Sequence, residues 1–174
     1  MKTFASLALV PFLGLTACAT GPELPAVPAQ LNPPAGERLA LVTRAAGVQI
    51  YECRARKDAS SQFEWAFVAP EAQLADTGGK PVGKHYAGPR WEAMDGSKVL
   101  GSVEQRAEAP QAGAIPWLLL GIRSDGPEGV FARFSHVQRV NTSGGVAPTA
   151  GCDASALGRQ ARVAYTSDYL FFAR

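Results

Sequence analysis

The sequence has almost no excess of charge of either sign. Its 17 Lys and Arg residues are nearly balanced by 15 Asp and Glu residues, which leaves a formal net charge of +2 at pH 7. Proteins that bind nucleic acid or acidic polymers carry a strong basic field on their surface. The charge balance therefore excludes nucleic acid as a predicted partner.

Histidine is also scarce, because the chain contains only His85 and His136. The two lie about 50 residues apart and neither is close in sequence to a cysteine, whereas metal sites draw on clusters of such ligands. We therefore predict no metal site. His136 lies in an alternating segment beside Arg133 and Arg139, and we interpret it as a surface or hydrogen-bonded histidine.

Long hydrophobic runs are lacking as well. The apolar run at residues 4–15 is shorter than the roughly 20 residues that span a bilayer, and it follows Lys2, which is typical of a secretory signal peptide. It ends in Leu15-Thr16-Ala17-Cys18, which resembles the lipobox of bacterial lipoproteins. We predict that residues 1–17 are a lipoprotein signal peptide and that Cys18 is lipidated. The alternative is an ordinary signal peptide followed by a chance cysteine.

Lipidation of Cys18 predicts the partner and the location of the protein. Each buried acyl methylene contributes about 0.8 kcal/mol, so more than one acyl chain gives a stable membrane anchor. Ala19, in place of Asp, resembles the sorting signal of lipoproteins sent to the outer membrane. We expect an outer-membrane lipoprotein of the bacterial cell envelope that faces the periplasm. Export also separates the chain from ATP and NAD, and we predict no cofactor.

Only two cysteines, Cys53 and Cys152, remain after Cys18. An even pair in an oxidising compartment predicts a disulfide. The bridge would close a loop of about 100 residues and stabilise the fold by at most about 4.7 kcal/mol in the chain-entropy model. Two buried free thiols are the alternative.

Glycine and proline, by contrast, are plentiful, with 18 and 13 residues against only two Met, which favours turns and short strands. Residues 19–36 contain five prolines without a periodic apolar face, a pattern typical of a polyproline-like tether. We predict a lipidated tether at residues 18–36 and one β-rich domain at residues 37–174. The boundary from Leu31 onward stays open.

Alternation of apolar and polar residues through this domain predicts short strands. Pro70 is expected to end one of them, before a short helical turn at residues 71–75, and Asp95-Gly96 predicts a hairpin turn. About eight strands with long loops predict an all-β fold, either an antiparallel sandwich or a small barrel. The extended segments are residues 37–43, 47–53, 63–67, 82–86, 90–94, 98–104, 114–122, 130–140 and 162–172.

Many motifs of the domain resemble, in the same order, those of a family called domain of unknown function 3455. The resemblance runs from near Leu39 to the end of the chain. It implies a shared fold and no particular activity. The matching segments are residues 47–53, 70–74, 82–91, 95–97, 115–120, 137–140 with Thr142, 144–148 and 163–169.

The segment at residues 83–97 is the richest in polar and aromatic side chains. One interpretation is a pocket for a small molecule or a carbohydrate, with Trp91 as a stacking platform. The structural alternative makes Trp91 a core residue and gives His85 a bond to a backbone carbonyl. The candidate ligand-binding residues are Lys84, His85, Arg90, Trp91, Asp95, Trp117 and Arg139.

No complete catalytic set is visible in the sequence. We therefore expect a binding or structural domain in the envelope. A hydrolase that uses His85, a side chain suited to acid–base chemistry, together with Asp95 is the alternative. Tyr165 and Tyr169 near the C-terminus are either core residues or an exposed carbohydrate-binding row, which burial would distinguish. The oligomeric state stays open.

Overall fold

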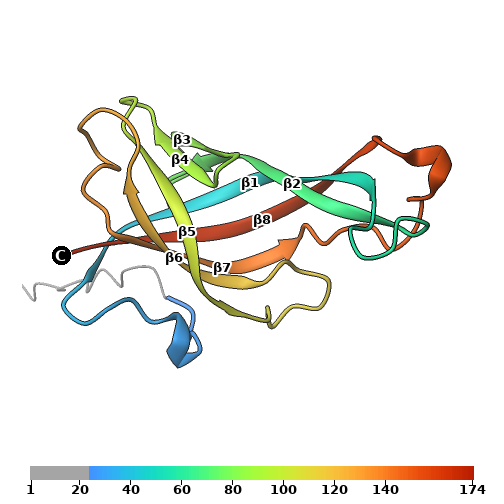
Figure 1. Cartoon of the computed structure of the whole chain (residues 1–174). Coiled ribbons are helices and arrows are strands. Elements are labelled where there is room, and N and C mark those ends of the chain that lie inside the picture. Colours follow the sequence, from blue (N-terminus) through green and yellow to red (C-terminus); the bar gives the residue numbers. More distant parts are fainter. Residues whose placement is uncertain (1–23) are drawn as a thin grey trace, which may run out of the picture.

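The computed structural model describes residues 24–174, and these form one antiparallel sheet of eight strands. Each strand pairs with the next along the chain, and the last pairs with the first, so the sheet closes into a barrel (Figure 1). This confirms the predicted all-β antiparallel class and decides between barrel and sandwich. The strands are β1 (Arg38–Ala55), β2 (Phe63–Ala75), β3 (Pro81–Tyr86), β4 (Arg90–Ala93), β5 (Lys98–Ala107), β6 (Trp117–Ser124), β7 (His136–Gly144) and β8 (Gln160–Ala173).

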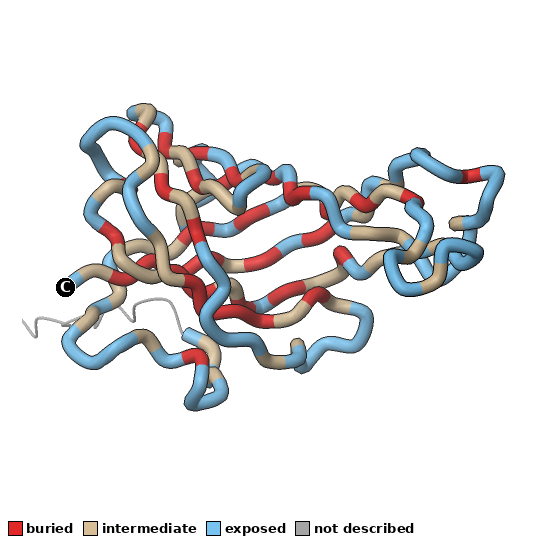
Figure 2. Tube along the Cα trace, viewed as in Figure 1, coloured by how far each residue is buried: buried red, intermediate tan, exposed pale blue. Residues whose placement is uncertain are grey.

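Alternation along the strands decides which side chains face the barrel interior. On β1 the buried positions alternate from Thr43 to Cys53, and on β8 they alternate from Tyr165 to Tyr169 (Figure 2). Phe172 is also buried, but it belongs to a second apolar cluster on the outside of the barrel. Strand β8 is therefore amphipathic in its middle and buried on both faces near its C-terminal end.

The β6–β7 loop fills one end of the barrel with the rings of Phe131 and Phe134, which together form an aromatic plug. Phe131 and Phe134 from this loop pack on Phe171 of β8, with ring centroids 4.9 and 5.3 Å apart. The predicted strand at residues 130–140 was therefore wrong in its first half, because β7 begins only at His136. Phe131 and Phe134 lie three positions apart and both face inward, which an alternating strand does not allow.

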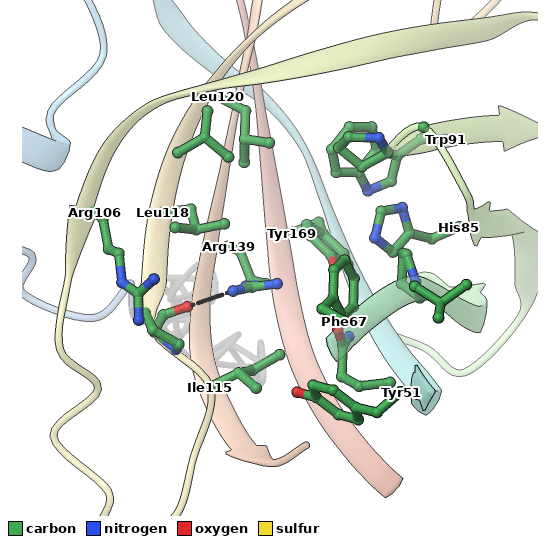
Figure 3. A pocket seen from close by; sticks show the side chains of 17 residues that line it. Tyr51, Phe67, His85, Trp91, Arg106, Ile115, Leu118, Leu120, Arg139 and Tyr169 are labelled. Atoms are coloured by element: carbon green, nitrogen blue, oxygen red, sulfur yellow. Dashed lines mark hydrogen bonds between the residues drawn. The ribbon is translucent and has the colours of Figure 1, made fainter. Parts of the chain in front are cut away.

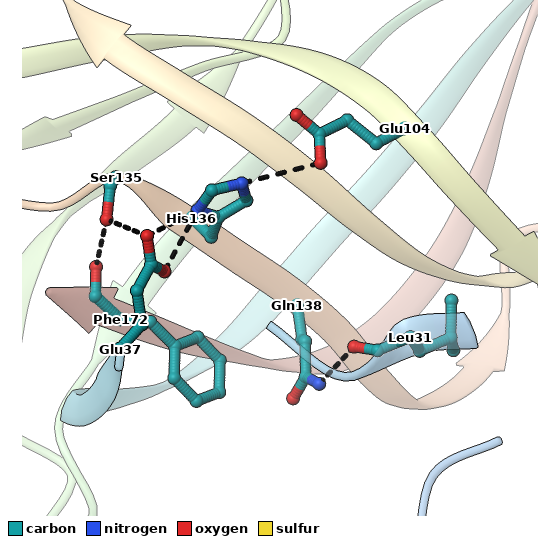
Figure 4. A network of polar contacts seen from close by, with 7 residues as sticks. All are labelled: Leu31, Glu37, Glu104, Ser135, His136, Gln138 and Phe172. Carbon is teal, nitrogen blue, oxygen red and sulfur yellow. Dashed lines mark hydrogen bonds and ion pairs between the residues drawn. The ribbon is translucent and has the colours of Figure 1, made fainter. Parts of the chain in front are cut away.

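The described part of the predicted tether packs on the outside of the barrel. Leu31, at the end of the short 3-10 helix η1 (Ala29–Leu31), is fully buried against Trp117 and Leu119 of β6. Its carbonyl accepts a hydrogen bond from Gln138 of β7 (Figure 4). This end of the tether is apolar enough to cover the outer face of the sheet, so the packed structure begins before residue 37.

A polar clasp fastens the same segment to β7. The buried carboxylate of Glu37 lies 2.9 Å from Nδ1 of His136 and accepts a 2.7 Å hydrogen bond from the Ser135 hydroxyl (Figure 4). Glu104 of β5 lies 3.4 Å from Nε2 of the same ring. His136 is thus hydrogen-bonded on the outer face, as the sequence predicted.

Pro70 does not end its strand, and the helical turn predicted at residues 71–75 is absent there, because β2 continues to Ala75. Pro70 is in register with Gln49 of β1, and β3 pairs with the other side of β2 only from Ala72 onward. Pro70 therefore lies where β2 has one free edge, and a proline on such an edge needs no ladder hydrogen bond from its nitrogen. The strand therefore tolerates it.

Beyond the barrel, β1, β2 and β8 extend into an arm that contains the second 3-10 helix, η2 (Ala154–Ala156) (Figure 1). A disulfide joins Cys53 near the end of β1 to Cys152 in the β7–β8 loop, 99 positions later. The predicted disulfide is therefore confirmed.

The predicted signal peptide and lipidated Cys18 lie outside the described residues. Within residues 24–174, no helix has the length and apolar character needed to cross a membrane.

Candidate functional site

The barrel contains a cavity of about 430 Å³. Pockets that bind small molecules usually measure about 300–1,000 Å³ and have mostly apolar walls. Figure 3 shows aromatic side chains on one side of the cavity and aliphatic side chains with an arginine on the other. The aromatic side carries Tyr51, Phe67, His85, Trp91 and Tyr169, and the opposite side carries Arg106, Ile115, Leu118 and Leu120.

Short strands leave this cavity open at one side. β3 and β4 have six and four residues, so the first half of β2 and the second half of β5 have no strand between them. Phe67 of β2 and Val103 of β5 line the cavity and are 54% and 53% exposed. Large apolar side chains at an opening are typical of a ligand entrance rather than of an ordinary surface.

His85 of β3 forms part of the cavity wall in a neutral form. Its ring is buried and stacks on Trp91, with centroids 4.5 Å apart, and Nδ1 lies 2.8 Å from the Arg90 carbonyl oxygen. Burial, opposed in part by that hydrogen bond, lowers the pKa of His85 to about 3. Since a carbonyl only accepts, Nδ1 carries the proton and Nε2 is left as an acceptor.

Trp91 of β4 fits both interpretations made from the sequence. It is almost fully buried and packs edge-on against Tyr169 and Phe171, so it is a core residue. It also lines the cavity, and its indole Nε1 has no hydrogen-bond partner among the described residues. A buried indole N–H usually finds a partner.

Arg139 of β7 brings a positive charge into the cavity. It pairs with Leu118 of β6 and Tyr169 of β8 across the sheet, and its side chain points between them (Figure 3). Nε and Nη2 both donate to the Pro116 carbonyl, at 3.1 and 2.8 Å. Arg139 forms no ion pair with any residue in the described part of the chain.

Two polar residues of β1, Gln49 and Tyr51, also line the cavity and were not predicted from the sequence. Gln49 is buried beside the Tyr165 hydroxyl, but its Nε2 does not reach hydrogen-bond geometry with that group or another described one. Tyr51 donates to the Gly145 carbonyl at 2.6 Å, and burial raises the pKa of its phenol. Their inward orientation could have been read from the alternation of β1, because Gln49 and Tyr51 lie on the same face of the strand as Cys53.

Lys84 and Arg90 do not join the cavity through their side chains. Lys84 forms an ion pair with Glu92 at 3.2 Å, and the guanidinium of Arg90 binds the carboxylate of Asp125. Lys84 and Arg90 are even-numbered positions of β3 and β4, whose buried residues are odd-numbered, so the side chains of both point away from the barrel interior. Arg90 contributes only its backbone carbonyl, which accepts a hydrogen bond from Nδ1 of His85.

Asp95 is a structural residue of the β4–β5 turn. One carboxylate oxygen accepts hydrogen bonds from the Ser97 backbone N–H and hydroxyl, and the other accepts from the Val130 N–H at 2.9 Å. These bonds, the Ser97 hydroxyl first, lower the pKa of Asp95. Asp95 therefore holds the loop that carries the aromatic plug, and it makes no contact with His85. The pair required by the hydrolase alternative is not formed.

Trp117 does not face the cavity either. It lies on the outer face of β6 in the cluster with Leu31, while its neighbour Leu118 faces inward. Of the seven candidate residues, the structure therefore brings together His85, Trp91 and Arg139. In the described part of the chain, no three His, Cys, Asp or Glu side chains are placed to hold one metal ion.

Tyr165 and Tyr169 are buried core residues rather than an exposed row. Their hydroxyl oxygens lie 3.5 Å apart inside the barrel, and burial raises the pKa of Tyr165. Tyr169 also lines the cavity.

Comparison with known proteins agrees with the resemblance noted from the sequence motifs. The family described as "Protein of unknown function (DUF3455)" matches residues 34–173. No match was found among curated proteins or among solved structures. The matched range contains all eight strands and every residue that lines the cavity. The chain belongs to the DUF3455 family.

Proposed function

We propose that this protein is a cell-envelope lipoprotein whose barrel binds one small, largely apolar molecule. The observation that carries the proposal is the cavity of about 430 Å³ inside the barrel. An eight-stranded barrel is just wide enough to be filled by side chains or to hold one small ligand. In this barrel the aromatic plug fills one part of the interior, and the cavity takes up another.

Polar side chains in the wall of the cavity support a ligand there. The guanidinium of Arg139 and the ring of His85 line the cavity together with mostly apolar side chains. A few convergent polar groups in an apolar wall are typical of a binding site.

The membrane anchor in this proposal rests on the sequence motif at Cys18. Acyl chains there would hold the barrel on the periplasmic side of the outer membrane. We expect radiolabelled palmitate to enter the wild-type chain and not a Cys18→Ala variant. Label that fails to enter the wild type, or that still enters the variant, would refute lipidation at Cys18.

The binding proposal is tested with the neutral fluorescent dye N-phenyl-1-naphthylamine and the full chain carrying Cys18→Ser, which cannot be acylated. We expect saturable binding at about one site per chain, weakened at least about tenfold, or about 1.4 kcal/mol, by Leu118→Trp, which fills the cavity. Val103→Trp narrows the entrance without touching the core and should have the same effect. Leu157→Trp, at an exposed position away from the cavity, is the matched control.

Thermal unfolding of each variant shows that the barrel is intact. The proposal is refuted if the dye does not bind saturably. It is also refuted if folded Leu118→Trp and Val103→Trp proteins bind the dye as tightly as the Leu157→Trp control.

A further inference from the structure

We infer that the ligand of this cavity is an organic anion whose acidic head binds Arg139 and whose apolar body lies against the aromatic wall. The inference rests on the proposed function and deepens it, because it names the chemical class of the ligand. Its basis is the charge distribution around the cavity, together with the size of the cavity and the composition of its walls.

The positive charge in the cavity is not balanced by an acidic side chain from the described part of the cavity wall. Arg139 and Arg106 line the cavity, and none of the other lining residues in the described chain is Asp or Glu. Arg106 lies at the exposed side, and its distance of 4.0 Å to Glu108 leaves it weakly paired. Removing a cation from water without pairing it is unfavourable, so a bound anion would stabilise this arrangement.

The orientation of Arg139 leaves it ready to bind an acidic group. Both of its hydrogen bonds go to one carbonyl, that of Pro116, which fixes the plane of the guanidinium. Nη1 takes no part in these bonds and remains available as a donor. A guanidinium that is fixed by its neighbours binds carboxylate or sulfonate oxygens through charge-assisted hydrogen bonds, the stronger class in proteins.

Tyr51 and His85, which line the cavity with Arg139, are neutral at neutral pH and cannot balance its charge. Burial raises the pKa of the Tyr51 phenol, so it keeps its proton. Burial also holds the pKa of His85 at about 3, so this ring is uncharged and offers Nε2 as an acceptor. A ligand that carries a hydroxyl or amide donor as well as an acidic head would satisfy both Arg139 and His85.

Cavity size and wall composition favour an organic anion over a small inorganic one. A space of about 430 Å³ is much larger than a phosphate or sulfate ion. Phe67, Trp91, Leu118 and Leu120 give it apolar walls, which such an ion would not contact favourably. An amphipathic acid matches both parts of the site.

Two dyes with the same aromatic body test the inference. 8-Anilinonaphthalene-1-sulfonate carries a sulfonate that N-phenyl-1-naphthylamine lacks. With the full chain carrying Cys18→Ser, we expect the anionic dye to bind more tightly than the neutral one. Arg139→Gln should weaken the anionic dye at least about tenfold, which corresponds to about 1.4 kcal/mol. It should weaken the neutral dye much less, so that the ratio of the two affinities falls.

Three further variants make the test independent of folding defects. Arg139→Lys keeps the charge and should retain most of the preference for the anion. Arg139→Met keeps the apolar stem and replaces Arg139→Gln if the latter does not fold. Arg162→Gln removes an exposed arginine that pairs with Glu71 outside the cavity, and it should change neither affinity.

The outcomes separate this inference from the proposed function. If the neutral dye binds in the barrel and Arg139→Gln leaves the ratio of the two affinities unchanged, the ligand class is refuted and the binding function stands. If neither dye binds saturably, the proposed function is refuted together with the inference.

Discussion

His85 shows how its position in the barrel fixes the chemistry of a single residue. The ring lies between Trp91 and Tyr169, with centroid distances of 4.5 and 5.0 Å, and no carboxylate among residues 24–174 forms a hydrogen bond with it. Its protonated form would place a further cation near Arg139, in a cavity whose lining in the described chain contains no Asp or Glu. His85 therefore acts as a neutral hydrogen-bonding group at physiological pH, and it is poorly suited to general base catalysis near neutrality.

This neutrality predicts a specific pH dependence of stability. A histidine whose pKa is lowered by folding, here from 6.5 to about 3, destabilises the native state as pH falls below 6.5, because the unfolded chain takes up the proton first. Between pH 7 and pH 5 this contributes a loss of about 2 kcal/mol in the free energy of unfolding. His85→Phe should lack this component, as urea unfolding at the two pH values would show.

Both proteins share their other titrating groups, so the difference between them isolates His85. Equal losses of stability in the wild type and the His85→Phe variant between pH 7 and pH 5 would contradict a neutral buried histidine at this position.

At the scale of elements, the N-terminal segment behaves as part of the barrel. Strand β6 is buried on both faces, since the cavity and plug residues cover its inner face and Leu31 covers its outer face. Gln138 and His136 of β7 bind the same segment through the carbonyl of Leu31 and the carboxylate of Glu37. The segment thus covers the outer face of β6 and β7 and replaces a helix or a second sheet in that role.

Leu31→Ala should therefore destabilise the protein by about 2–4 kcal/mol, as expected for the loss of a fully buried leucine side chain. Leu157→Ala is the matched control, because Leu157 is 60% exposed and its truncation should change stability by less than about 0.5 kcal/mol. Urea unfolding followed by tryptophan fluorescence measures both. Similar effects of the two substitutions would show that the segment does not pack on the barrel in solution.

At the scale of the whole molecule, the disulfide and the pairing of β1 with β8 both join distant parts of the chain. Strand β1 pairs with β8 over nearly its whole length, from Arg38 to Glu52. The bridge between Cys53 and Cys152 fastens the arm immediately beyond that ladder. Cross-linking residues 99 positions apart restricts the unfolded chain strongly.

Replacing both Cys53 and Cys152 by Ala should lower the free energy of unfolding by about 2–5 kcal/mol. Urea unfolding with and without a reducing agent provides the control, because reduction should destabilise only the wild type. Peptide mapping under non-reducing conditions identifies the bridge. Free thiols at both positions, or equal stabilities of the two proteins, would contradict this prediction.

Prediction from the sequence succeeded where a local pattern reports the environment. A strand with one buried face alternates with a period of two, so the all-β class could be predicted from alternation alone. It failed where both faces of a strand are buried. In β6, Trp117, Leu118, Leu119 and Leu120 are all buried, so nothing in the pattern says that Trp117 faces outward.

The all-β class, the approximate strands, the pairing of Cys53 with Cys152 and the expectation of an anchor at Cys18 could be predicted from residue order. They follow from periodicity, composition and cysteine number, which are local or additive properties of a chain. That His85 and Arg139 line the same cavity while Lys84, Asp95 and Trp117 do not is a property of the folded barrel. These residues lie on different strands and turns, and only closure of the barrel determines which of their side chains meet in its interior.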